Sequence, residues 1–171
     1  MFEFGRELRR LMAGGPVAGL HRDGLTGGDA ALLELLDLRL LVNEARGADV
    51  AAGRISSKDR PARLVEASVV WREVARRSGE AAALRKAASC AEQAARLFRE
   101  AGRASGVARA RAEQGLCGLL AADLFGDEGL VAAAERVLDE AEGASGVGAA
   151  LAAAALAGLR GRAALARGGD V

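Results

Sequence analysis

A short sequence that occurs twice constrains the fold of this chain more than any other feature. Residues Ala104–Val107 read Ala-Ser-Gly-Val, and the same four residues return at Ala144–Val147, at an offset of 40. The residues before each copy also correspond, with a small, a large and a small side chain at 94, 98 and 101 and again at 134, 138 and 141. A fixed spacing of this length is typical of proteins that stack one supersecondary unit on the next. The sequence therefore predicts a repeat array.

The composition indicates that the repeated unit is helical. Of the 171 residues, 41 are alanine, tyrosine is absent, and isoleucine and threonine occur once each. Alanine is the strongest helix former, whereas strands depend on β-branched and aromatic side chains. Hydrophobic residues make up 51% and charged residues 27%, as in a globular domain rather than a disordered chain. We expect an all-α fold of stacked antiparallel helix hairpins, with about six or seven helices.

Glycine, proline and capping residues predict where these helices begin and end. Asp29 is expected to cap a helix that Gly47 ends, Pro61 opens the next helix, and Trp71 is expected to anchor its core. Residues 1–28 are expected to form a short amphipathic helix and a glycine-rich connector, and residues 29–171 the repeat domain. The expected helices cover 2–13, 30–46, 61–78, 80–101, 107–124, 128–142 and 147–167.

The small, large, small pattern resembles the second helix of the tetratricopeptide repeats. The similarity is to the longer variety, with about 40 residues per hairpin, found in bacterial signalling proteins and transcription activators. Leu156–Asp170 is similar to that family's first helix and its glycine-aspartate turn, and Gly126–Asp127 matches an earlier copy of the turn. The aromatic residue usual in the first helix is replaced by Ala121 and Ala164. The last repeat is expected to be incomplete, since it lacks a second helix.

The resemblance also implies a binding surface. In this family the first helix of each hairpin lines a concave groove that binds partners. The matching positions in this chain are Val69, Arg72, Arg76, Leu119 and Arg162. These residues imply an apolar groove with arginines at its rim, which suits an acidic or amphipathic peptide. The alternative is that the arginines only form an ordinary solvent-exposed surface of the array.

No catalytic or metal-binding arrangement is recognisable in the sequence. His21, the only histidine, lies in the glycine-rich connector, where a general base would be held poorly. Cys90 and Cys117 with one remote histidine do not make a zinc ligand set. They are equidistant from the turn around 102–106 and are expected to be neighbouring, buried, free thiols. We expect a protein that is not an enzyme and that needs no metal or cofactor.

The charge pattern bears on location and partners. Arginine outnumbers lysine 22 to 2, but the net charge is only +1, whereas a nucleic-acid binder carries a basic excess. The N-terminus has no apolar run suited to a signal peptide. The uncharged stretch Gly143–Leu159 is mostly alanine and glycine, which gain little from lipid. We expect a cytoplasmic protein with no membrane span whose partner is not nucleic acid.

The expected function is a protein-protein interaction scaffold, an adaptor or a regulatory sensor module. The alternative is an N-terminal regulatory domain of a longer enzyme or transcription regulator, which the incomplete last repeat favours. The helix over 147–167 has no charged or strongly polar residue from Gly148 to Leu159, so its apolar face must be covered. We expect a homodimer through Leu151 and Leu156, unless the N-terminal segment covers that face.

Overall fold

The structure, a computed structural model, describes residues 27–56, 58–144 and 146–168, with side chains for 34, 36–56, 58–144 and 146–161. The chain forms two units, 1–37 and 38–171, and the repeat array lies in the second. The helix predicted at 2–13 lies outside the described residues. Over the described ranges the fold is all-α without strands, as predicted. Its helices are α2 (Gly27–Arg54), α3 (Arg60–Ser78), α4 (Ala81–Glu100), α5 (Ala104–Phe125), α6 (Glu128–Glu142) and α7 (Val147–Gly168).

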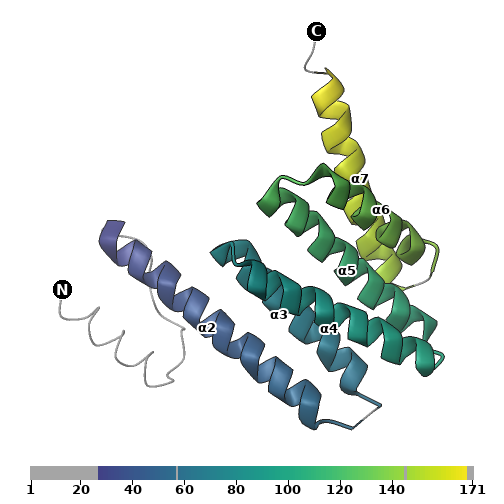
Figure 1. Cartoon of the computed structure of the whole chain (residues 1–171), viewed down its shortest axis with the longest axis horizontal. Coiled ribbons are helices and arrows are strands. Elements are labelled where there is room, and N and C mark those ends of the chain that lie inside the picture. Colours follow the sequence, from purple (N-terminus) through teal and green to yellow (C-terminus); the bar gives the residue numbers. More distant parts are fainter. Residues whose placement is uncertain (1–26, 57, 145, 169–171) are drawn as a thin grey trace. The chain divides into compact units, whose positions relative to one another are not determined.

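Helices α3 to α7 pack in the order of the sequence (Figure 1). The pairs α3/α4 and α5/α6 are hairpins, and α4 packs on α5 to join them. Helix α5 also contacts α3 and α7, so the first helices of successive hairpins touch directly. In the described part of the chain, α4 and α6 make no such contact. The second unit is therefore a stack of helix hairpins with α5 at its centre.

The turns form where the sequence predicts them. Gly79 ends α3 and Gly126 ends α5, both in the left-handed conformation, with φ of 71° and 66°. Glycine is the residue that adopts this conformation without steric cost. Asp127 then caps α6, because its Oδ1 accepts a hydrogen bond of 2.9 Å from the backbone N–H of Gly129. The glycine-aspartate turn thus ends one helix and begins the next.

The prediction for the first described helix was wrong at both ends. Helix α2 begins before Asp29, and it continues through Gly47 to Arg54. Ala45 and Ala52, on either side of Gly47, are both buried in the core. Packing of this continuous alanine face outweighs the cost of a glycine inside a helix, about 1 kcal/mol. Helix α5 also begins earlier than predicted, at Ala104 instead of Val107.

The repeated small and large residues form the core of the hairpins. Ala94, Phe98, Ala134 and Leu138 are all buried. The ring of Phe98 lies against Gly106 and the side chain of Leu138 against Gly115, so closely that a methyl group on either glycine would overlap them. Both large side chains therefore pack into glycine gaps on α5. The third position differs between the copies, because residue 141 is buried and residue 101 is exposed.

Two further expectations about the core are confirmed. Trp71 is only 6% exposed and packs among apolar side chains of α2 to α5. Cys90 and Cys117 are both buried and free. They belong to different core clusters, and that they are neighbours stays a prediction. Among the helices described, none is both long and apolar enough to cross a membrane.

Candidate partner-binding surface

The five groove residues implied by the family resemblance do not share one open surface. Val69 and Arg76 are exposed on α3. Leu119 is buried on α5, packed with core residues of α6 and α7. Arg162 lies in α7, and its side chain is outside the described residues. The fifth residue, Arg72, is engaged inside the protein.

Arg72 joins α3 to α5 through a bidentate ion pair. Its Nε donates to Oε1 of Glu113 at 2.5 Å, and its Nη2 donates to Oε2 at 3.3 Å. The Glu113 side chain is 4% exposed and that of Arg72 24%. Burial alone would lower the pKa of Arg72, but the hydrogen bond and charge of Glu113 raise it above its ordinary value. Arg72 therefore holds the two hairpins together and is not free to bind a partner.

Arg76 is paired as well, although on the surface. Glu73 accepts hydrogen bonds from Arg76 and from Arg77, at 2.6 to 2.8 Å. The hydrogen bond from Arg76 is the main reason that the pKa of Glu73 falls to about 2, opposed in part by burial. Arg76 is thus already paired with a carboxylate of its own helix, which it shares with Arg77.

Asp49 is the centre of a polar cluster that the sequence did not indicate. Its carboxylate accepts from Trp71 Nε1 at 3.0 Å, from Lys86 Nζ at 2.8 Å and from Cys90 Sγ at 3.6 Å. The Lys86 ammonium also lies 4.5 Å from the centre of the Trp71 ring. The cluster ties the C-terminal half of α2 to α3 and α4. Its members are separated by up to 41 residues, so no local pattern could reveal it.

The two thiols are unsuited to nucleophilic chemistry. Burial, and then the negative charge of Asp49, raise the pKa of Cys90 to about 11. Burial, and then the charge of Glu113, raise the pKa of Cys117 to about 12. Since the thiolate is the reactive form, both groups are protonated and inert at neutral pH.

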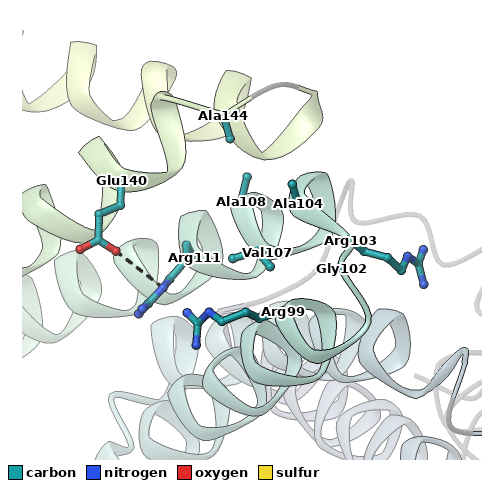
Figure 2. A pocket seen from close by; sticks show the side chains of 9 residues that line it. All are labelled: Arg99, Gly102, Arg103, Ala104, Val107, Ala108, Arg111, Glu140 and Ala144. Carbon is teal, nitrogen blue, oxygen red and sulfur yellow. Dashed lines mark ion pairs between the residues drawn. The ribbon is translucent and has the colours of Figure 1, made fainter.

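An open pocket of about 420 Å³ lies where the turn after α4, the start of α5 and the end of α6 meet (Figure 2). Its apolar wall includes Ala104 and Val107 from the first copy of the repeated sequence and Ala144 from the second. A side chain on Gly146 would contact Ser105, so the two copies lie together in space. The pocket is lined by Arg99, Gly102, Arg103, Ala104, Val107, Ala108, Arg111, Glu140 and Ala144.

The arginines of this pocket have different surroundings. In Figure 2 the guanidinium groups of Arg99 and Arg111 lie on one side of the pocket, and that of Arg103 points the other way. Arg103 donates to the carbonyl of Lys58 and lies 4.9 Å from the centre of the Phe98 ring. Within the described residues, Arg99 has no ion-pair partner. The charge of Arg99 is therefore uncompensated at the rim, and Arg103 likewise has no ion pair among the described residues.

A second, more polar pocket of about 300 Å³ adjoins the first. Arg99 and Arg111 line both pockets and so lie between them. The second pocket adds Glu92, Gln93, Ala95 and Arg96 from α4. Together the two pockets make a groove with an apolar part and a polar part. The repeated residues recognised in the sequence line this groove, but the family resemblance predicted the binding surface at other positions.

The two residues predicted for self-association, Leu151 and Leu156, differ in their exposure to solvent. Leu156 is 3% exposed and belongs to the core formed by α5, α6 and α7, so its predicted place on the surface was wrong. The apolar face of α7 turns inward there because α5 and α6 already cover it. Leu151 is 40% exposed and Val147 66%. Of the two residues predicted for self-association, only Leu151 therefore lies on the surface, and self-association through α7 stays a prediction.

In comparisons with protein families, with curated proteins and with solved structures, nothing matches this chain.

Proposed function

We propose that this chain is a protein-protein interaction module, a scaffold, adaptor or regulatory sensor built from tetratricopeptide-like hairpins. The observation that carries the proposal is the pocket of Figure 2, which has an apolar wall and an arginine rim. It lies where the two copies of the repeated sequence meet, at the junction of successive hairpins. Partner peptides commonly dock apolar anchors into grooves between helices.

The size and lining of the pocket support a peptide side chain as its occupant. A volume of about 420 Å³ lies in the lower part of the range for ligand sites. The wall formed by Ala104, Val107, Ala108 and Ala144 offers apolar contact but no precisely placed hydrogen-bonding groups. Such a wall suits the aliphatic or aromatic anchor of a peptide, whose backbone continues into the polar pocket beside it.

The state of the cysteines supports a cytoplasmic location as part of the proposal. Cys90 and Cys117 are free. Unbridged cysteines are usual in reducing compartments, where thiols are kept reduced.

The test is a selection of peptides from a displayed random library against the purified chain. We expect enriched peptides that carry an apolar anchor and bind in the pocket. Ala104→Trp and Ala144→Trp place a large side chain at exposed positions of the pocket wall and should weaken binding about tenfold or more, the loss expected when an anchor is displaced. Ala132→Trp, at an exposed position of α6 outside the pocket, is the matched control.

Circular dichroism of each variant verifies that the helices are retained. Enriched peptides that bind both pocket variants as tightly as the original chain would contradict the proposal. A selection that enriches no peptide would contradict it too.

A further inference from the structure

We infer that Arg99 and Arg111 receive a carboxylate of an acidic, amphipathic partner peptide, and that Glu140 is an internal competitor that this carboxylate replaces. The inference rests on the proposed function and deepens it, because it names the chemistry of the partner. Three observations carry it: the charges at the groove, the geometry of Glu140, and the place of Glu140 in its helix.

The first observation is the excess of positive charge. Arg99 and Arg111 line both pockets and present their guanidinium groups on the same side (Figure 2). Four arginines and two glutamates, Glu92 and Glu140, line the two pockets, although Arg96 lies 3.9 Å from Glu100 and Arg103 points away from Arg99 and Arg111. Like charges held close together are unfavourable unless an anion lies between them. An added carboxylate would relieve the repulsion, and guanidinium groups bind carboxylates with well-defined geometry.

The second observation is that Glu140 holds Arg111 weakly. The nearest atoms, Arg111 Nε and Glu140 Oε2, are 3.8 Å apart, which is beyond hydrogen-bonding distance. The Glu140 side chain is 63% exposed, whereas that of Arg111 is 28% exposed. Arg111 is kept in place independently, since its Nη1 donates to Gln114 Oε1 at 2.9 Å. Glu140 can therefore leave while the guanidinium group stays in position.

The ion pair between Arg72 and Glu113 differs from that between Arg111 and Glu140 in its geometry and burial. That pair is bidentate, its shortest distance is 2.5 Å, and its carboxylate is buried. An exposed pair at 3.8 Å contributes little to stability. The protein thus loses almost nothing when a partner takes the place of Glu140.

The third observation is the position of Glu140 in α6. The helix ends at Glu142 and has no basic residue in its last turn. The C-terminal end of a helix carries partial negative charge, so an acidic side chain there is unfavourable. Asp139 and Glu142 share this last turn, but among the described residues only Glu140 of the three is in an ion pair, and its partner is Arg111.

The test measures binding of a fluorescein-labelled peptide of alternating leucine and glutamate by fluorescence anisotropy. A peptide with glutamine in place of glutamate is the second probe. Arg99→Gln and Arg111→Gln should each weaken binding of the glutamate peptide about fivefold, the upper range for an exposed ion pair. Glu140→Gln should tighten it by about twofold to fivefold, because the competitor is removed. Arg136→Gln, an exposed arginine of α6 outside both pockets, should have no effect.

Tighter binding after Glu140→Gln is a gain that a damaged fold cannot produce. The glutamine peptide should respond to none of the three groove variants. Unchanged or weaker binding of the glutamate peptide to Glu140→Gln overturns the inference, and so does equal affinity for the two peptides or binding of neither. The proposed function is decided separately by the library selection, because pocket-dependent peptides without acidic residues would uphold it and reject the inference.

Discussion

The ion pair between Arg72 and Glu113 leads to a prediction that depends on which partner is removed. Arg72→Met leaves the Glu113 carboxylate without a partner at a site where its side chain is 4% exposed. An uncompensated buried charge costs about 3 to 5 kcal/mol. Glu113→Leu leaves an unpaired guanidinium group, but the Arg72 side chain is 24% exposed and can reach water. The expected cost is therefore smaller, about 1 to 2 kcal/mol.

The double variant should recover most of the loss. With both Arg72→Met and Glu113→Leu, no charge remains buried and two apolar side chains face each other between α3 and α5. Replacement of a buried ion pair by apolar residues is often neutral or stabilising. The two single variants should then be strongly non-additive, with a coupling energy of several kcal/mol, on the order of the buried-pair penalty itself.

The measurement is unfolding in urea, followed by the fluorescence of Trp71, the only tryptophan and a core residue beside Arg72. A loss of about 3 to 5 kcal/mol is a large part of the 5 to 15 kcal/mol typical of a domain, so the midpoint should fall clearly. Arg63→Met is the control, because Arg63 pairs with Glu66 on the surface and should cost less than about 1 kcal/mol.

Equal losses of unfolding free energy for Arg72→Met and Glu113→Leu would refute the argument from burial. Additive losses in the double variant would refute the argument that one partner compensates the other. A loss for Arg63→Met as large as that for Arg72→Met would show that the assay reports arginine content and not this pair.

Three further predictions follow from the described contacts. Gly148→Ala would push a methyl group into the backbone of α5 and should destabilise the chain by about 1 to 3 kcal/mol. Gly158→Ala, in the same helix, meets open space and should stabilise the chain by up to about 1 kcal/mol, and thermal unfolding distinguishes the two variants. Cys90 and Cys117, with pKa values of about 11 and 12, should resist an aromatic disulfide reagent at neutral pH in the native state and react in urea; fast native reaction would contradict their burial. The pKa of Glu73 is lowered from 4.5 to about 2, so its ion pairs should give a small stabilisation that is present above pH 4.5 and disappears as the pH falls toward 2. An NMR titration of the Glu73 carboxyl group measures this pKa directly.

The sequence predicted those helices whose two ends carry a local signal. Gly79, Gly126 and Asp127 act through their own backbone or side chain within a few residues, so their effects are visible in the sequence. Gly47 carries the same signal but lies inside α2. Its neighbours are buried by contacts with α3 and α4, and these contacts are not encoded in the local pattern.

The candidate site was less predictable for a related physical reason. Arg72 appeared to be a surface residue because its partner, Glu113, is 41 positions away. Arg99 and Arg111 stand on different helices, and only the turn between α4 and α5 brings them to one groove. Residue spacing along one helix predicts which side chains share a face, but it does not predict which face of the next helix they meet. The repeated sequence lies at the candidate pocket because its first copy directly follows that turn.

The sequential packing of α3 to α7 bears on how the chain reaches its native state. Among the described residues, α3 to α7 contact one another only across one or two steps along the chain. Closing such short loops costs little entropy, so proteins dominated by local contacts fold quickly. Among the described residues the hairpin of α3 and α4 makes no contact with α6 or α7, so it can form before they have been synthesised. We therefore expect the array to assemble from its N-terminal hairpin onward during translation. Hydrogen exchange in stalled nascent chains should show protection in α4 before α7 has emerged from the ribosome.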